Sequence, residues 1–115
     1  MIKIIICGSR GFRDLSLVEQ KVINLQADCD YVLMTGNARG VDQAAEHQAY
    51  ISGVYNLQFP ADWDKHGKAA GIIRNIEMLD HIPDKVIAFW DGKSPGTKHM
   101  IEQSLKRKIN LEVIF

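Results

Sequence analysis

Arginine side chains are concentrated in glycine-containing segments that follow apolar runs of strand length. Three of the five arginines stand in such segments, and a fourth lies in a helical pattern within reach of them: Arg10, Arg13, Arg39 and Arg74. A guanidinium group binds phosphate or carboxylate through paired hydrogen bonds, whereas the nine lysines are spread along the chain, as solubilising charges usually are. We expect at least two of the four arginines to contact an anionic ligand. The alternative is that they brace the loops by pairing with nearby acids, namely Asp14, Asp42, Asp62 or Glu77.

Residues 35–42 have the composition of a phosphate-binding turn. They follow the apolar run 31–34 and precede a helical pattern, so they join a buried strand to a helix. Glycine lets the backbone approach a ligand closely, and the free N–H groups of a helix's first turn favour an anion. The ligand-binding residues predicted here are Gly36, Asn37, Ala38, Arg39, Gly40 and Asp42, the last of which would fix a ribose or base.

Two further segments are predicted to face each other across a binding crevice. Residues 8–14 contribute Gly8, Ser9 and Arg10. The sequence Ser94-Pro95-Gly96-Thr97 opens a helix and offers hydroxyl and backbone N–H groups to an anion. Plain helix capping explains the serine and the proline, but the pair of glycines at positions 92 and 96 favours binding. The ligand-binding residues predicted in this second segment are Asp91, Ser94, Gly96 and Thr97.

Three aromatic residues are candidates for stacking on a base. Trp63 and Trp90 each stand beside an aspartate at the end of a predicted strand, where they either stack on a ligand or pack in the core. Phe12 lies in a polar, glycine-containing loop, which favours ligand contact.

Other chemistries have little support in the sequence. Residues 8–13 lack the spacing of a dinucleotide fingerprint, and no Walker-type motif occurs, so neither NAD chemistry nor P-loop phosphoryl transfer is indicated. The four histidines lack metal-ligand spacing with one another and with the two cysteines, and Ser9 lacks the context of a catalytic nucleophile. We expect no metal and no cofactor.

The elements that position these residues alternate between strand and helix, as in parallel β-α-β units. The strand-like runs cover residues 2–7, 31–34, 55–59, 86–90 and 111–115. Four helices are predicted between them, with apolar stripes that decide which face is buried. The first follows an N-cap at Asp14 and carries Leu15, Val18, Val22 and Leu25; the second covers about residues 39–52 and stops at Gly53. The third is marked by Ala69, Ile72, Ile73, Ile76 and Leu79, and the fourth starts at Ser94-Pro95 and carries Met100, Ile101 and Leu105.

These elements predict an α/β fold in which a five-stranded parallel sheet lies between two layers of helices. Nearly continuous apolar strands are covered on both faces, and right-handed crossovers favour the strand order 3-2-1-4-5. Ligands of such folds bind at the carboxyl edge of the sheet, where the strand order reverses. The crevice is therefore expected where residues 8–14 face residues 91–97.

Length and composition describe an ordinary globular chain. The 115 residues are predicted to form one domain, with 46% hydrophobic and 24% charged residues. Lys plus Arg and Asp plus Glu both number 14, so net charge gives no argument for a nucleic-acid or membrane partner. Cys7 and Cys29 are expected to be reduced. The apolar run of residues 2–7 is too short and wrongly flanked for a signal peptide, so none is expected, and no apolar stretch approaches membrane-spanning length. A cytoplasmic location is expected.

Five ordered motifs together resemble the YspA-type, cpYpsA-related branch of the SLOG superfamily. They are Gly8-Ser9-Arg10, Gly36-x-Ala38-Arg39-Gly40-Val41-Asp42, Phe59-Pro60-Ala61-Asp62-Trp63, Ala70-Gly71-x-x-Arg74-Asn75 and Phe89-Trp90-Asp91-Gly92-x-Ser94-x-Gly96-Thr97. The resemblance implies a Rossmann-like domain, similar to the DNA-processing protein DprA and to the LOG phosphoribohydrolases, that binds nucleotides or molecules derived from them. Small members of this branch resemble bacterial and phage proteins.

One departure from the LOG pattern bears on catalysis. LOG enzymes carry G-T-x-x-E, whose glutamate serves N-glycosidic bond cleavage, whereas here Gly96-Thr97 is followed three residues later by Met100. A thioether transfers no proton, and Glu102 lies about 200° further round the helix. LOG-type hydrolysis through this position is therefore not supported.

Three functions remain open. The first is a binding module for a small nucleotide-like ligand, such as an ADP-ribose-like or cyclic molecule, acting as a sensor or sequestering protein. The second is an enzyme that cleaves an N-glycosidic bond with another carboxylate, for which the candidates are Asp91, Asp62 and Glu77. The third is nucleic-acid binding after the manner of DprA, which the zero net charge disfavours. A homo-oligomer is compatible with each.

Overall fold

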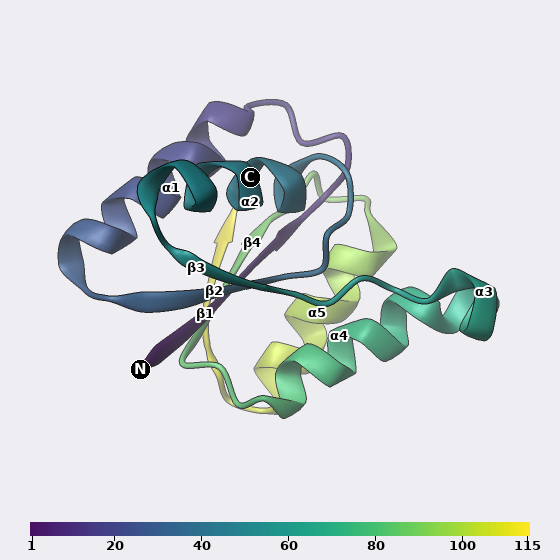
Figure 1. Cartoon of the computed structure of the whole chain (residues 1–115). Coiled ribbons are helices and arrows are strands. Elements are labelled where there is room, and N and C mark those ends of the chain that lie inside the picture. Colours follow the sequence, from purple (N-terminus) through teal and green to yellow (C-terminus); the bar gives the residue numbers. More distant parts are fainter.

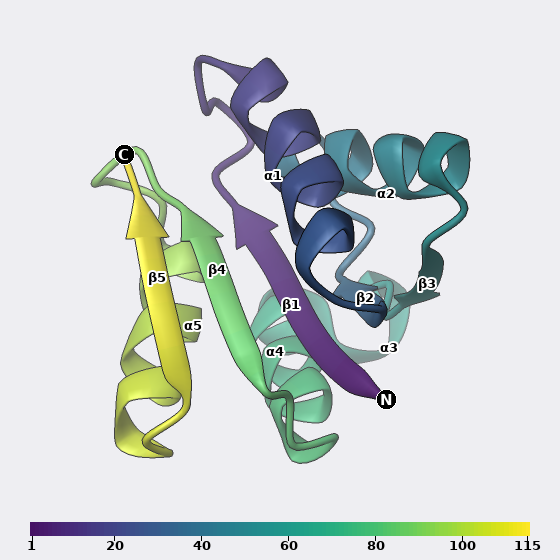
Figure 2. The same ribbon diagram turned by 90° about the vertical axis from the view of Figure 1, so that its left-hand side faces the viewer.

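The computed structural model describes all residues, 1–115, and has one sheet of five parallel strands. The sheet order is β3-β2-β1-β4-β5, which confirms the predicted α/β architecture and strand order. The strands are β1 (Ile2–Gly8), β2 (Tyr31–Thr35), β3 (Tyr55–Gln58), β4 (Lys85–Phe89) and β5 (Asn110–Ile114). Figure 2 shows β1, β4 and β5 running in the same direction. All five predicted strands are present, with ends that differ by at most one residue.

Helices cover both faces of the sheet (Figure 1). One layer consists of α1 (Leu15–Asp28) and α2 (Val41–Ser52), and the opposite layer consists of α4 (Ala70–Asp80) and α5 (Pro95–Lys106). Two short elements precede α4: α3 (Trp63–His66) and the 3-10 helix η1 (Gly67–Ala69). No helix has the length and apolar character needed to cross a bilayer.

Alternation along the central strand divides the core into two clusters, one on each face of the sheet. Ile4 and Ile6 pack beneath α1 and α2, whereas Ile5 and Cys7 pack with residues of α4 and α5. Successive side chains of a strand point to opposite faces, so a strand covered on both sides is apolar throughout. The three-layer arrangement follows from this pattern.

The helix ends that the sequence signalled most clearly are found in the structure. Asp14 caps α1 by accepting a hydrogen bond from the backbone N–H of Ser16 at 3.1 Å. Gly53 ends α2 in a left-handed conformation with φ of 73°, which glycine adopts without steric cost. Pro95 is the first residue of α5, where its missing N–H costs no helical hydrogen bond.

Other helix predictions were wrong in detail. The second helix begins at Val41 rather than near Arg39, and the predicted third helix is preceded by two additional short elements. Ile72 and Ile73 are largely exposed, as is Leu105 on α5. The inner face of α4 is instead formed by its buried residues, Ala70, Asn75, Met78 and Leu79. On α5 the buried residues are Thr97, Met100 and Ser104.

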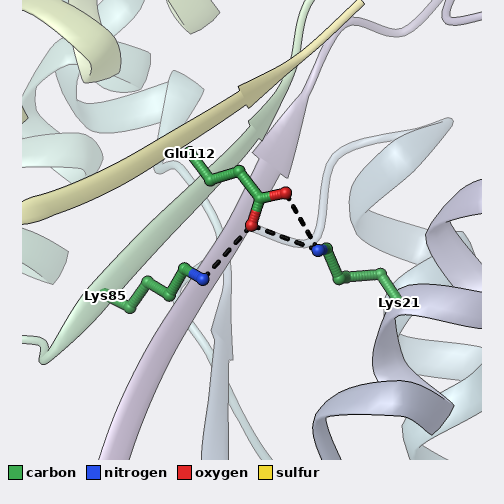
Figure 3. Close-up of polar contacts among 3 residues, drawn as sticks. All are labelled: Lys21, Lys85 and Glu112. Atoms are coloured by element: carbon green, nitrogen blue, oxygen red, sulfur yellow. Dashed lines mark hydrogen bonds and ion pairs between the residues drawn. The ribbon is translucent and has the colours of Figure 1, made fainter.

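An ion-pair cluster ties the first helix to the edge strand (Figure 3). The carboxylate of Glu112 on β5 accepts hydrogen bonds from the ammonium group of Lys21 on α1 at 2.9 and 3.1 Å. Lys85, at the start of β4, lies 3.2 Å from the same carboxylate. The cluster therefore bridges α1, β4 and β5.

Candidate functional site

A cavity of about 470 Å³ lies at the carboxyl edge of the sheet. One wall comes from the connection after β1 and includes Gly8 and Arg10, and the facing wall comes from the connection after β4. The second wall holds Asp91, Ser94, Pro95, Gly96 and Thr97. Residues of α4 and the first turn of α2 complete the lining. The structure thus brings most of the sequence-predicted site residues into one crevice.

The floor of the crevice is apolar and rich in sulfur. Cys7, Met78 and Met100 line it, and each is buried. Burial raises the pKa of the Cys7 thiol well above its usual range, so this group is a neutral thiol rather than a thiolate nucleophile. Met100, three residues after Thr97, contributes a thioether to the floor and no acid or base.

Ser9 joins the two walls instead of presenting a free hydroxyl to a ligand. It is 1% exposed, and its Oγ accepts a hydrogen bond from the backbone N–H of Asp91 at 3.1 Å. Its own backbone N–H donates to the carbonyl of Phe89 at 3.0 Å. The prediction of Ser9 as a ligand contact is corrected to a role in positioning the Asp91 turn.

Asp91 is held as an ionised carboxylate at the mouth of the crevice. Its Oδ1 accepts hydrogen bonds from the backbone N–H groups of Ser94 and Lys93, both at 2.8 Å. These bonds hold its pKa below the usual range. Asp91 is therefore suited to accept hydrogen bonds from sugar hydroxyls or to stabilise a cation, and poorly suited to donate a proton.

The first turn of α5 keeps free donors. The side chain of Ser94 does not cap the helix, and its Oγ lies 3.3 Å from Oγ1 of Thr97. The backbone N–H groups of Gly96 and Thr97 find no acceptor within the chain. They provide the helix end with hydrogen-bond donors for a ligand in the crevice.

Two backbone amides of the glycine turn after β2, residues 36–40 (the β2 turn), are occupied by Asp42 of the chain itself, so these amides do not form the predicted phosphate cradle. Oδ2 of Asp42 accepts hydrogen bonds from the backbone N–H groups of Gly36 at 3.1 Å and Ala38 at 3.2 Å. The carboxylate of Glu46 accepts a hydrogen bond from the hydroxyl of Thr35, at the end of β2. The amides of Gly36 and Ala38 are therefore not free to hold a phosphate.

Asp42 is buried, and its carboxylate has an unusual titration. It is 4% exposed, and burial raises its pKa to about 6 despite the opposing effects of the bond from Ala38 and of the Arg74 charge. Its side chain still lines the crevice. The main role of Asp42 in the structure is to stabilise the β2 turn through its two hydrogen bonds.

Arg74 and Asn75 connect the β2 turn, α4 and α5. Nη1 of Arg74 donates to the carbonyl of Gly36 at 2.6 Å, and Nε donates to Oδ1 of Asn75 at 3.1 Å. Nδ2 of Asn75 donates to the carbonyl of Gly96 at 3.2 Å. A Cβ at Gly36 would lie 2.2 Å from the guanidinium group, so the arginine packs directly across this glycine. Asn75 was not predicted as a site residue from the sequence. A polar residue beside Arg74 on a mainly apolar helix was the feature that could have indicated it.

Two glycines act through packing. A Cβ at Gly8 would lie 2.6 Å from the carbonyl oxygen of Phe89 and 2.7 Å from Cγ2 of Val41. Gly40 has φ of 83°, and a Cβ there would lie 2.7 Å from the carbonyl oxygen of Arg10. Both glycines let the connections after β1 and β2 approach each other closely. The ligand-contact prediction for Gly40 is therefore corrected to a packing role.

None of the four arginines that were considered as ligand contacts forms an ion pair with an acidic residue, so the structure does not support the alternative that they brace the loops in this way. The ion pairs of the structure are Lys21–Glu112, Lys85–Glu112 and Arg107–Asp80. Arg10 lines both the crevice and an adjoining hollow of about 310 Å³, and Arg39 lines that hollow alone. Arg13 faces a separate hollow formed with Trp90 and Phe115.

The aromatic candidates are placed differently from one another. Trp63, 52% exposed, lines the crevice and the adjoining hollow and is available for stacking. Phe12 packs in the core with its ring edge-on to Phe89, the ring centroids 5.4 Å apart, so its stacking prediction is corrected. Trp90 lies outside the crevice, where its Nε1 donates to the carbonyl of Ser94 at 3.1 Å.

Among the candidate catalytic carboxylates, Asp91 lines the crevice and the other two do not. Asp62 caps α3 by accepting a hydrogen bond from the backbone N–H of Lys65 at 3.1 Å. Glu77 is exposed on a part of α4 that does not line the crevice. The structure therefore corrects the predictions for Asp62 and Glu77, since neither lines the crevice.

Comparison with known proteins agrees with this architecture. The family model YAcAr, described as the YspA, cpYpsA-related SLOG family, matches residues 2–66. The Gene 61 protein of Mycobacterium phage D29 is 35% identical over 118 residues, which cover 95% of this chain and 93% of that protein. The X-ray structure of TM1055, a Northeast Structural Genomics Consortium target, aligns with a TM-score of 0.75 at 15% identity, covering 96% of this chain and 72% of that one.

The likeness to the solved structure shows a shared fold, whereas the two sequence matches show the family. The family model covers more than half of the chain, and the phage relative aligns over nearly its whole length. This chain belongs to the YspA, cpYpsA-related SLOG family.

Proposed function

We propose that the protein binds a nucleotide or a nucleotide-derived molecule in the crevice at the carboxyl edge of the sheet. The observation that carries the proposal is the combination of groups around one cavity of about 470 Å³. Arg10 and the free N–H groups of α5 offer donors, Asp91 offers an acceptor, and Trp63 offers an aromatic face beside an apolar floor. Small-molecule sites commonly measure about 300–1,000 Å³ and combine apolar walls with few polar groups.

Family membership supports a role in binding or processing nucleotide-related ligands. The relative from phage D29 suggests a biological setting in which such a protein senses or sequesters a signalling nucleotide of the host. In this role the protein holds its ligand and releases it unchanged, because the crevice has an apolar thioether at Met100 where a catalytic acid would stand.

Asp91 favours a second candidate function, cleavage of an N-glycosidic bond. It is an ionised carboxylate that lines the crevice, and a carboxylate near the ribose stabilises the positive charge that develops as such a bond breaks. Its low pKa leaves protonation of the departing base without an evident donor. Binding without turnover is therefore the primary proposal.

The first experiment separates these functions and tests the crevice. Purified protein is titrated with ribonucleotides by calorimetry, and the ligand is then recovered and analysed by chromatography. Recovery of intact nucleotide supports binding, whereas release of free base identifies the enzyme. Preference for single-stranded oligonucleotides over mononucleotides would instead indicate a DprA-like role.

Arg10 provides the matched variant. Arg10→Ala removes a donor that lines the crevice and should weaken nucleotide binding by about 1.5–3 kcal/mol. Arg13→Ala removes another exposed arginine of the same connection, which does not line the crevice, and should leave the affinity unchanged. Equal losses in the two variants would place the ligand elsewhere.

A further inference from the structure

Three arginines converge on the 310 Å³ hollow beside the crevice. Arg10, Arg39 and Arg74 line it, together with the β2 turn, Pro60, Ala61 and Trp63. No aspartate or glutamate is among its lining residues. The hollow therefore concentrates positive charge in a chain whose formal net charge is zero.

None of these three guanidinium groups is paired with a carboxylate. Arg74 is held in place by neutral acceptors, the carbonyl of Gly36 and Oδ1 of Asn75, so its position is fixed. Its charge also acts on the nearby carboxylate of Asp42, but the two form no ion pair. Like charges gathered around one hollow repel one another unless an anion lies between them. The arrangement fits recognition of phosphate, which guanidinium groups bind through paired hydrogen bonds.

The crevice next to it has a mixed charge. Asp42 and Asp91 line the crevice together with Arg10 and Arg74, and Asp91 is ionised. Carboxylates disfavour phosphate and favour the hydroxyl groups of a sugar. The two cavities share Arg10, Ala38, Trp63 and Arg74, so a single ligand can extend from one into the other.

Building on the proposed function, we infer that the hollow is the phosphate subsite and that the crevice holds the sugar and base. The ligand class is a nucleotide with two linked phosphate groups, such as a nucleoside diphosphate or its derivative. Three unpaired arginines match more negative charge than the roughly 1.5–2 charges that a single terminal phosphate carries at pH 7. Arg39 contacts the phosphate farther from the sugar, because it lines the hollow and not the crevice.

The test uses inorganic pyrophosphate, orthophosphate, and matched mono- and diphosphates of the four common ribonucleosides as calorimetric probes. Pyrophosphate should bind more tightly than orthophosphate, and each bound nucleoside diphosphate more tightly than its monophosphate. Arg39→Ala should weaken pyrophosphate and diphosphate binding at least about tenfold, the effect of losing one charged hydrogen bond. Arg13→Ala should change these affinities less than about twofold. Arg39 is exposed, and circular dichroism confirms that both variants are folded.

The outcomes separate this inference from the proposed function. If nucleotides bind and Arg39→Ala behaves like Arg13→Ala, the phosphate subsite is overturned while nucleotide binding stands. If pyrophosphate binds in an Arg39-dependent manner and no nucleotide binds more tightly than pyrophosphate, the subsite stands and the proposed function fails. If neither pyrophosphate nor any nucleotide binds, both are overturned.

Discussion

The carboxylate of Asp42 is the clearest case of a single residue whose surroundings set its chemistry. Its Oδ2 accepts two backbone N–H groups of the β2 turn, and burial raises its pKa from 3.8 to about 6. The folded state therefore binds a proton more tightly at this group than the unfolded chain does. The stabilising effect of that proton is complete below about pH 4 and is lost as the pH rises through about 6.

Asp42→Asn tests this linkage. The amide oxygen can still accept from the turn but carries no charge, so the variant lacks this part of the pH dependence. Between pH 4 and pH 7 the free energy of unfolding of the parent should fall by about 2 kcal/mol relative to the variant, as expected for a pKa raised from 3.8 to about 6 when part of the titration lies below pH 4. Urea denaturation across this range measures it. Glu46 and Arg74, the charged neighbours of Asp42, are present in both proteins, and parallel curves would contradict the raised pKa.

For single residues, the sequence predicted which residues lie at the site better than it predicted what each of them does there. Arg10, Arg74 and Asp91 were expected to line the crevice and do so. The sequence could not show that Asp42 folds back onto its own turn, because an aspartate in a helix's first turn can face either a ligand or the preceding loop. It also could not show that Phe12, in a polar loop, turns inward onto Phe89.

Close packing between elements depends on Gly8, where β1 meets β4 and α2. A methyl group at this position would lie 2.6 Å from the carbonyl oxygen of Phe89, the last residue of β4. Because that backbone cannot move without disturbing β4, Gly8→Ala should destabilise the protein by about 1–3 kcal/mol. Gly11→Ala is the matched control, since a Cβ there meets nothing within 4 Å. Chemical denaturation compares the two, and equal stability would refute the packing role of Gly8.

The ion-pair cluster around Glu112 makes a smaller contribution between elements. Partial burial acts to raise the pKa of Glu112, but the bonds from Lys21 and Lys85 lower it overall. A lowered pKa in the folded state means that the stabilisation is present above the ordinary value and is lost as the pH falls. The side chain is 36% exposed, so solvent screens much of the attraction.

Glu112→Gln should therefore cost only about 0.2–1 kcal/mol at low salt, and less in 1 M salt. Thermal unfolding at the two salt concentrations measures the effect. Glu77→Gln serves as the control, because Glu77 is exposed and belongs to none of the ion pairs. A loss that is large and independent of salt would mean that Glu112 acts through packing rather than charge.

At the element scale, strands were easier to predict than helix faces. The apolar runs identified all five strands, whereas the apolar stripe predicted for α4 was right for Leu79 and wrong for Ile72 and Ile73. Arg74 and Asn75 lie toward the sheet because they bond to the carbonyls of Gly36 and Gly96. A helix that presents polar residues to a binding site cannot be oriented from hydrophobicity alone, and Ile72 and Ile73 are left exposed as a result.

For the whole molecule, the strand order could be predicted because few topologies satisfy right-handed, uncrossed connections in a parallel sheet. That order places the connections after β1, β2 and β4 at the carboxyl edge of the sheet. Residues of α4 complete the lining of the crevice at this edge. A ligand bound there contacts segments from distant parts of the sequence. Binding should therefore stabilise the fold as a unit, by about 2.7 kcal/mol when the ligand is at 100 times its Kd.

This coupling gives a prediction for thermal unfolding. At that ligand concentration the unfolding midpoint should rise by about 10 °C for a chain of this size. Unliganded Arg39→Ala should have nearly the parent midpoint, since the side chain is exposed and unpaired. At the same concentration of a nucleoside diphosphate its midpoint should rise less. A lower midpoint without ligand would mean that Arg39 supports the fold.

Hydrogen exchange locates the same coupling in the structure. Bound nucleotide should slow amide exchange in residues 8–14, 36–42 and 91–97, which surround the two cavities at the carboxyl edge. The turns at the opposite edge, at Gly53, Asp84 and Lys108, should exchange at the unliganded rate, because they lie at the amino ends of the strands. Mass spectrometry of peptides with and without a nucleoside diphosphate measures both sets in one experiment. Equal protection at the two edges would mean that the ligand tightens the whole fold rather than binding at this site. Protection confined to the amino edge would place the ligand there and not in the crevice.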